Sequence, residues 1–158
     1  MNCKSCDHKA ICKISFGDDD VCENYYPSSL RPSKDEYYLG IAKAVSARST
    51  CLRRHYGAVI VNNDEIISTG YNGPPRGEVH CITCKRIGHE HNDGDYSTCE
   101  SIHAEMNAII SASRSEMLGA TLYLYGEENG HPITAEPCPI CKRIIKNAGI
   151  SQVKMSLS

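Results

Sequence analysis

Apolar and polar residues follow one another along the chain in patterns that predict three helices and four strands. Apolar residues recur at helical spacing over residues 34–48, whereas 56–61 and 65–71 have the composition of strands. The polar run 62–64 between these two strands suits a hairpin turn. Farther along, the pattern predicts a helix over 102–113, a strand over 121–125, a helix from Pro137 to Gly149 and a strand over 150–157.

The order of these elements predicts an α/β fold. It favours a layered domain with a mixed sheet of four to five strands, built from one antiparallel hairpin and parallel crossovers. Residues 126–135 are polar and indicate a turn or a short hairpin. The segment from about residue 72 to Cys99 is rich in Gly, His, Cys and Asp and has no regular pattern. A loop of that length needs something to order it, and a bound metal ion is one candidate.

Composition narrows the class of protein. A length of 158 residues suits one domain with a core of its own, and a net charge of −2 argues against a broad nucleic-acid-binding surface. The longest uninterrupted apolar run is 58–61, far shorter than the roughly 20 residues of a membrane span. The first ten residues are too polar for a secretory signal. We therefore expect a cytoplasmic protein with no membrane partner, a cysteine-rich head over residues 1–32 and a main domain over 33–158.

The chain has ten cysteines, and most of them occur in groups, which suggests metal sites because a reducing compartment disfavours disulfides. Cys51 stands alone and is interpreted as a small buried hydrophobe. In the head, the spacing of four cysteines resembles a compact structural zinc site. A tail with incidental thiols, or a redox pair, fits the same spacing. These four are Cys3, Cys6, Cys12 and Cys22.

A second group of cysteines lies in the long loop, next to several histidines. It suggests a further structural zinc that would tie the loop down, without a clear choice of fourth ligand. The alternative is a flexible loop with solvated histidines. The number of zinc ions per chain distinguishes these cases. The cysteines are Cys81, Cys84 and Cys99, and the histidines are His80, His89 and His91.

The third group has the chemistry of a catalytic metal site. Cys138 and Cys141 lie three residues apart at the predicted start of a helix, so both sulfurs can reach one ion, and the helix dipole favours their thiolates. His103 and Glu105 lie together at the start of another predicted helix. Two thiolates and one imidazole leave one of the four positions of zinc open for water, as in catalytic sites. Glu105 is then free to move protons. The alternative interpretation of this group is that the cysteines are ordinary thiols, His103 is a core histidine and Glu105 is a surface acid.

These motifs resemble those of the cytidine/deoxycytidylate deaminase superfamily. His-Ala-Glu at 103–105 and Pro-Cys-Pro-Ile-Cys at 137–141 match the pattern of zinc nucleobase deaminases. Gly-Tyr-Asn-Gly at 70–73 and the Cys/His-rich loop are most similar to the deoxycytidylate (dCMP) deaminase branch. The resemblance covers about residues 35–157. It implies a three-layer α/β/α sandwich and a homo-oligomer, from dimer to hexamer.

The resemblance also implies a role for each matched residue. His103, Cys138 and Cys141 would bind the catalytic zinc, and Glu105 would be the general acid and base. Asn72 would contact the sugar or the base of the substrate. The implied reaction is hydrolytic deamination of dCMP to dUMP, with one catalytic zinc and one or two structural zinc ions possible.

The substrate phosphate requires cations at the rim of the site. Arg76 is the first candidate because it lies four residues from Asn72, and Arg48, Arg53 and Arg54 are the others. Alternative substrates are dCTP, cytidine or another base such as guanine. A tRNA adenosine deaminase would need a more basic surface. A non-catalytic, zinc-stabilised regulatory module is a further alternative, against which the intact Glu105 argues.

Two departures from the family pattern affect the expected fold. Residues 126–135 insert a polar segment between the third predicted strand and Pro137, close to the expected substrate site. The sequence given ends at Ser158, directly after the last predicted strand, so the usual fifth strand of the family is expected to be missing.

Overall fold

The computed structural model describes residues 31–90, 93 and 96–158 of the chain. The chain divides into two units, Met1–Lys34 and Asp35–Ser158, and the second contains the folded domain. Among the described residues, no helix is both long enough and apolar enough to cross a membrane. The predicted ligands of the head, Cys3, Cys6, Cys12 and Cys22, lie outside the described residues, as does His91, and the site in the head stays a prediction.

The described residues form four helices and five strands, and each of the seven predicted elements is present. The helices are α1 (Lys34–Ser46), α2 (Ala104–Ile110), α3 (Arg114–Met117) and α4 (Pro139–Ala148). The strands are β1 (Arg54–Asn62), β2 (Glu65–Tyr71), β3 (Thr121–Glu128), β4 (His131–Ile133) and β5 (Gln152–Met155).

The predicted helix over 102–113 is shorter than expected, and α3 follows it as a separate turn. Ser113 has extended backbone and accepts a hydrogen bond from the Glu116 N–H, while the Glu116 carboxylate accepts one from the Ser113 N–H. This reciprocal capping starts a new helix and so prevents α2 from continuing through Ser113.

The sheet is mixed, as predicted, but it has two hairpins instead of one. Strand β1 pairs antiparallel with β2 on one edge and with β3 on the other. The far edge of β3 is shared, because β5 pairs with its first half in parallel and β4 pairs with its second half antiparallel. The segment 126–135 is therefore the short hairpin, with its turn at Asn129 and Gly130, where φ is positive (53° and 78°). It supplies a fifth strand to the sheet.

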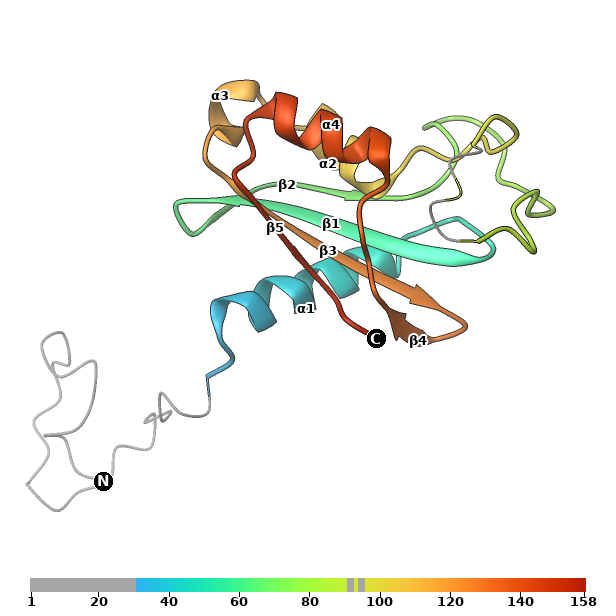
Figure 1. The fold of residues 1–158 in the computed structure, drawn as a ribbon, viewed down its shortest axis with the longest axis horizontal. Coiled ribbons are helices and arrows are strands. Elements are labelled where there is room, and N and C mark those ends of the chain that lie inside the picture. The colour runs from blue at the N-terminus through green and yellow to red at the C-terminus, as the bar shows by residue number, and fades with distance from the viewer. Residues whose placement is uncertain (1–30, 91–92, 94–95) are drawn as a thin grey trace, which may run out of the picture. The chain divides into compact units, whose positions relative to one another are not determined.

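Helices cover both faces of the sheet and complete the expected three layers. Helix α1 lies on one face, and α2, α3 and α4 lie on the other (Figure 1). The central strands are buried on both sides, so successive side chains enter different cores. Ala58 and Ile60 of β1 pack in the core beneath α2 and α4, whereas Val59 and Val61 pack in the core beneath α1.

Two glycines let the helices approach the sheet closely. A Cβ at Gly57 in β1 would lie 2.0 Å from the main-chain oxygen of Ala42 in α1. A Cβ at Gly70 in β2 would lie 2.3 Å from the main-chain oxygen of Ala104 and 2.3 Å from the Ala108 nitrogen in α2. Real Cβ atoms do not approach main-chain atoms this closely, so each helix rests directly on a glycine. Gly70 thereby fixes the depth at which α2 begins.

We expect Gly57→Ala to destabilise the domain, because the new methyl group overlaps the backbone of α1 and cannot be accommodated by a side-chain rotation. Overpacking of this kind costs about 1–3 kcal/mol or more. The control is Gly40→Ala in the exposed part of α1, where nothing lies within 4 Å of the new Cβ. That change should stabilise the helix by about 0.5–1 kcal/mol. Urea unfolding of both variants measures the two effects, and equal unfolding midpoints would contradict the packing argument.

Candidate functional site

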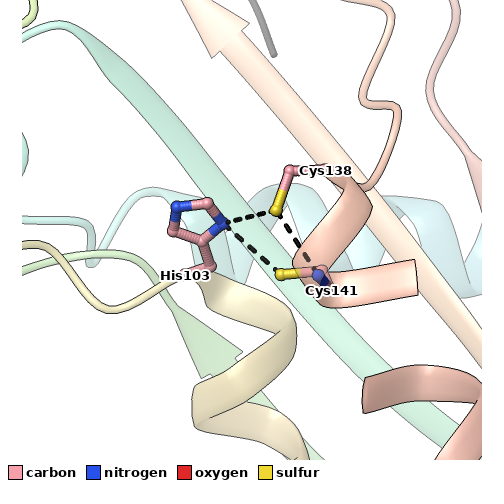
Figure 2. Close-up of side chains that lie close together, drawn as sticks. All are labelled: His103, Cys138 and Cys141. Carbon is pink, nitrogen blue, oxygen red and sulfur yellow. Dashed lines mark hydrogen bonds between the residues drawn. The ribbon is translucent and has the colours of Figure 1, made fainter. Parts of the chain in front are cut away.

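The starts of α2 and α4 meet and bring together one imidazole and two sulfurs. His103 is the N-cap residue of α2, Cys138 is the N-cap residue of α4, and Cys141 lies in the first turn of α4. The His103 Nδ1 atom is 3.5 Å from the Cys138 sulfur and 3.4 Å from the Cys141 sulfur. Figure 2 shows the three side chains pointing toward one another from the two helix ends. The sequence prediction of this cluster is thus confirmed as a possible metal site.

Helix α4 begins in a way that favours this arrangement. Pro139 occupies its first turn, where a missing N–H costs nothing, and the Cys138 sulfur accepts a hydrogen bond from the Cys141 N–H. Gly149 ends the helix in the left-handed conformation, with φ of 87°. Both cysteines therefore lie at the positive end of a well-formed helix, where thiolates are stabilised.

The donor set fits a zinc ion. The three ligand atoms lie within 4.8 Å of one another, and both cysteines are buried. Hydrogen bonds from Cys141 lower the pKa of Cys138 to about 3, whereas the Cys138 sulfur and burial raise the pKa of Cys141. The pair by itself therefore holds one negative charge, and a divalent cation would allow both sulfurs to ionise. Nitrogen and sulfur ligands with room for one more are the set that zinc prefers in catalytic sites.

Glu105 lies next to this cluster, in the first turn of α2. Its side chain is only 5% exposed, and Glu105 lines a cavity together with His103 and Cys138. Burial raises the pKa of this carboxyl, so it holds a proton more readily than an exposed glutamate. A carboxyl group in this position is suited to accept and return protons beside a metal ion.

The cluster opens into a cavity of about 360 Å³, which is large enough for a small ligand. Its walls include Tyr56 and Asn72 on the sheet side, together with His103, Glu105 and Cys138 at its base. The long loop forms most of the remaining wall, together with residues 51–54, Leu124 and Glu136. An isolated bridge between Gly73 and Ile102 closes the base of this loop, with hydrogen bonds of 3.2 and 2.8 Å.

Asn72 is held rigidly at the cavity wall. Its Oδ1 atom accepts hydrogen bonds from the Tyr56 N–H (2.7 Å) and the Ser49 hydroxyl (2.7 Å), and its Nδ2 atom donates to the Arg54 carbonyl (2.9 Å). The side chain is 7% exposed. Its predicted contact with substrate stays a prediction, and these bonds give it a fixed orientation.

Arg76 is exposed and is not among the residues that line the cavity in the described part of the chain. Arg53 and Arg54, two of the alternative arginines, do line it.

The loop cysteines line the same cavity but do not form a tight cluster. Cys81, Cys84 and Cys99 are half-buried. Within the described residues, only His103, Cys138 and Cys141 bring ligand atoms within 4.8 Å of one another. The interpretation of Cys51 as a buried hydrophobe is wrong, since it is half-buried, lines the cavity and lies 3.1 Å from the Ser101 hydroxyl.

Two further cavity residues were not predicted from the sequence. The Tyr96 ring packs edge-on against the His103 ring, with ring centroids 5.0 Å apart, and the Arg86 guanidinium lies 4.7 Å from the centre of the Tyr96 ring. Arg86 also forms an ion pair with Asp93, with N–O distance 2.6 Å. This chain of contacts links the loop to His103, a candidate metal ligand. No local sequence motif marks it, because each contact depends on how the loop folds back over α2.

Comparisons with known proteins identify relatives over most of the chain. The family model described as "Cytidine and deoxycytidylate deaminase zinc-binding region" matches residues 32–157. The deoxycytidylate deaminase of Mycobacterium phage D29 is 42% identical over 129 residues, which cover 78% of this chain and 94% of that protein. The deoxycytidylate deaminase of Saccharomyces cerevisiae is 38% identical over 82% of this chain, but the match spans only 39% of the yeast protein.

A solved structure is similar over most of the domain. The dCMP deaminase of cyanophage S-TIM5, determined in complex with dCMP and dUMP, superposes with a TM-score of 0.60 and 29% identity, over 80% of this chain and 82% of that one.

We expect the purified protein to contain zinc. The Cys138→Ala variant should contain one zinc ion fewer per chain, because the loss of one of three protein ligands weakens binding so that the ion is lost on dialysis. Metal analysis by mass spectrometry after dialysis measures this count. Cys81→Ala is compared with the wild-type protein in the same way. Its zinc content should be lower by one ion per chain only if the loop cysteines hold a structural zinc. An unchanged zinc content in Cys138→Ala would contradict the assignment of this cluster.

Proposed function

Because the chain belongs to the cytidine and deoxycytidylate deaminase family, we propose that it is a zinc-dependent hydrolase that converts dCMP to dUMP and releases ammonia. The observation that carries this proposal is the arrangement of His103, Cys138 and Cys141 beside the buried Glu105 at the base of one cavity. The D29 phage relative, which this chain matches over nearly its whole length, is named for the same activity. The C–N bond of a cyclic amidine, at C4 of cytosine, is the bond that the reaction would break.

Zinc in this position supplies the Lewis-acid chemistry that allows water to ionise near neutral pH. Glu105 transfers the protons as the general base and then the general acid. It takes a proton from the attacking water as the oxygen bonds to C4, and it gives that proton to ring atom N3. It then takes the hydroxyl proton of the tetrahedral carbon and delivers it to the amino group. The C4–N4 bond breaks, ammonia leaves, and the C4 carbonyl of dUMP remains.

The raised pKa of Glu105 suits this cycle, because the group has to hold a proton between the two transfers. A carboxyl with an ordinary pKa would lose that proton to solvent more readily. Burial of Glu105 also removes bulk water from the reacting atoms. Its position at the start of α2 keeps it within reach of the base of the cavity.

Asn72 supports recognition of the substrate in this proposal. Three hydrogen bonds fix its amide group, and we propose that its second Nδ2 proton donates to the sugar of the nucleotide. The Tyr96 ring, which packs against His103, also lines the cavity. Oligomeric state and a cytoplasmic location stay predictions from the sequence.

Glu105→Gln should keep zinc and lose most turnover, because an amide can neither accept nor return the proton. We expect dCMP-dependent ammonia release to fall by about 10²–10⁴-fold, the usual contribution of general acid–base catalysis. Glu65→Gln is the matched control, since Glu65 is an exposed carboxylate at the start of β2, outside the residues that line the cavity. Zinc analysis accompanies both assays. Retained activity in a zinc-loaded Glu105→Gln protein would remove this residue from the mechanism.

A substrate panel distinguishes dCMP from the alternatives. Ammonia release is measured with dCMP, dCTP, deoxycytidine, cytidine and guanine at equal concentration. We expect the highest kcat/KM for dCMP. A chain that loads zinc but releases ammonia from none of them would instead support the non-catalytic module.

A further inference from the structure

The His103 imidazole is contacted on two sides by different kinds of group. Its Nδ1 atom faces the sulfurs of Cys138 and Cys141, at 3.5 and 3.4 Å. The Tyr96 ring packs edge-on against it, with ring centroids 5.0 Å apart and an angle of 74° between the ring planes. A metal-binding histidine usually donates its other ring N–H to an oxygen, which fixes the ring orientation. Within the described residues, no oxygen accepts such a bond from His103 Nε2, and the Tyr96 ring is the neighbour that limits rotation.

The Tyr96 ring is itself held by a buried arginine. The Arg86 guanidinium carbon lies 4.7 Å from the centre of the ring, in a cation–π contact. Arg86 is only 8% exposed, although it belongs to an irregular loop. A buried charge needs a partner, and Asp93 provides one at an N–O distance of 2.6 Å. The main-chain carbonyl of Arg86 accepts a hydrogen bond from the Arg53 guanidinium, which ties this part of the loop to the residue before β1.

These contacts connect the loop to one of the three candidate ligands and not directly to the other two. The series runs from Asp93 through Arg86 and Tyr96, and its last step crosses from the loop to His103 at the start of α2. The two cysteines belong to the start of α4 instead, where the helix itself positions them. A displacement of the loop would therefore free the imidazole while both sulfurs stay in place.

We propose that Tyr96 is a positioning residue, which holds the His103 imidazole with its Nδ1 atom toward the two sulfurs. Arg86 and Asp93 act through Tyr96 in this proposal. It rests on the zinc site of the proposed function and adds that the order of the loop sets how firmly the third ligand is held. Outer-shell groups that orient a ligand typically contribute about 10–100-fold to metal affinity.

The first test measures the rate at which purified protein loses zinc to an excess of chelator. Tyr96→Leu removes the aromatic edge, and we expect zinc release to be about tenfold faster, at the lower end of the outer-shell range. Tyr96→Phe keeps the ring and should retain the wild-type rate. Tyr37→Leu is the matched control, because Tyr37 of α1 also packs edge-on against a ring, that of Tyr38, at a centroid distance of 5.0 Å. It should leave the rate unchanged.

A second zinc ion in the loop would add a second phase to the release. The Cys138→Ala variant identifies the phase that belongs to the His103 cluster, because it lacks that ion. The comparison between Tyr96→Leu and the wild-type protein is made on this phase alone.

The second test asks whether Arg86 acts through Tyr96. Arg86→Gln alone should speed zinc release by about threefold, because it removes the cation–π contact. Added to Tyr96→Leu, the same change should give no further increase, since the ring on which it acts is gone. Independent structural roles would multiply the two effects instead. Arg114→Gln, at an exposed arginine of α3, is the control and should leave the rate unchanged in both backgrounds.

A spectroscopic measurement reports the geometry of the ligands directly. Cobalt(II) in place of zinc has visible absorption bands whose positions depend on the arrangement of the ligands. We expect Tyr96→Leu to shift these bands and Tyr37→Leu to leave them in place. Circular dichroism confirms that each variant is folded.

Zinc release from Tyr96→Leu at the wild-type rate would overturn the positioning role, as would unshifted cobalt bands. Equally fast release from Tyr37→Leu would overturn it too, because the effect would then come from general loss of stability. Failure of the proposed function has a different signature: zinc-loaded wild-type protein would release no ammonia from dCMP, while the rate of zinc release would still report on Tyr96. Wild-type protein that holds no zinc would overturn both proposals.

Discussion

The candidate active site depends on the close approach of two helix starts over one face of the sheet. Cys138 and Cys141 are members of the same buried cluster as Ala104 and Ala108 of α2, so these two candidate metal ligands are also core residues. Gly70 lets α2 rest on β2, where its closest neighbour is the main chain of Ala104. Ala104 lies between His103 and Glu105 in sequence, so this contact positions both residues. Packing of the core therefore sets the geometry of the ligands. Such a site tolerates little change in volume, because close-packed cores transmit small displacements.

Ionisable groups in an apolar core lose the hydration of their charged forms. In this site the groups are acidic, so a bound cation would offset that loss. Glu105 is buried and its pKa is raised, while Cys138 and Cys141 compete for a single negative charge. A divalent ion would relieve the competition between the sulfurs and attract the neighbouring carboxylate. Binding and folding are coupled in that case, since the unfolded chain offers no assembled set of ligands. With a metal ion bound, the site would be a part of the core that the ion completes.

Local sequence signals predicted the parts of the fold and site that depend on neighbouring residues. The hairpin between β1 and β2, the cysteine-containing start of α4 and its end at Gly149 all follow from short-range preferences, and the structure confirms them. His103 and the two cysteines were predicted because motif spacing on helices is local.

Most of the features that sequence reasoning missed are non-local. The short hairpin over 126–135 was one of two predicted alternatives, and its strand β4 pairs with β3. The separate helix α3 was missed although its cap is local, because Ser113 and Glu116 lie inside a pattern that predicts one continuous helix. The cavity position of Cys51 depends on a contact with Ser101, 50 residues away in sequence, and the contact of Tyr96 with His103 depends on the path of an irregular loop. No periodicity encodes such contacts. The choice between Arg76 and Arg53/Arg54 likewise depends on distance in space, and proximity along the chain pointed to a residue outside the cavity wall.

Strand β3 extends beyond its predicted end because charged residues pair across the sheet there. Beyond the predicted end of the strand, Glu127 and Glu128 pair across the sheet with His55 and Arg54, so acidic residues oppose basic ones at each position. This charge complementarity explains why the polar segment continues the sheet instead of leaving it as a loop. The candidate metal ligands come from helix starts above the sheet, whereas this charge pairing lies at the end of the sheet, so a change in one need not displace the other.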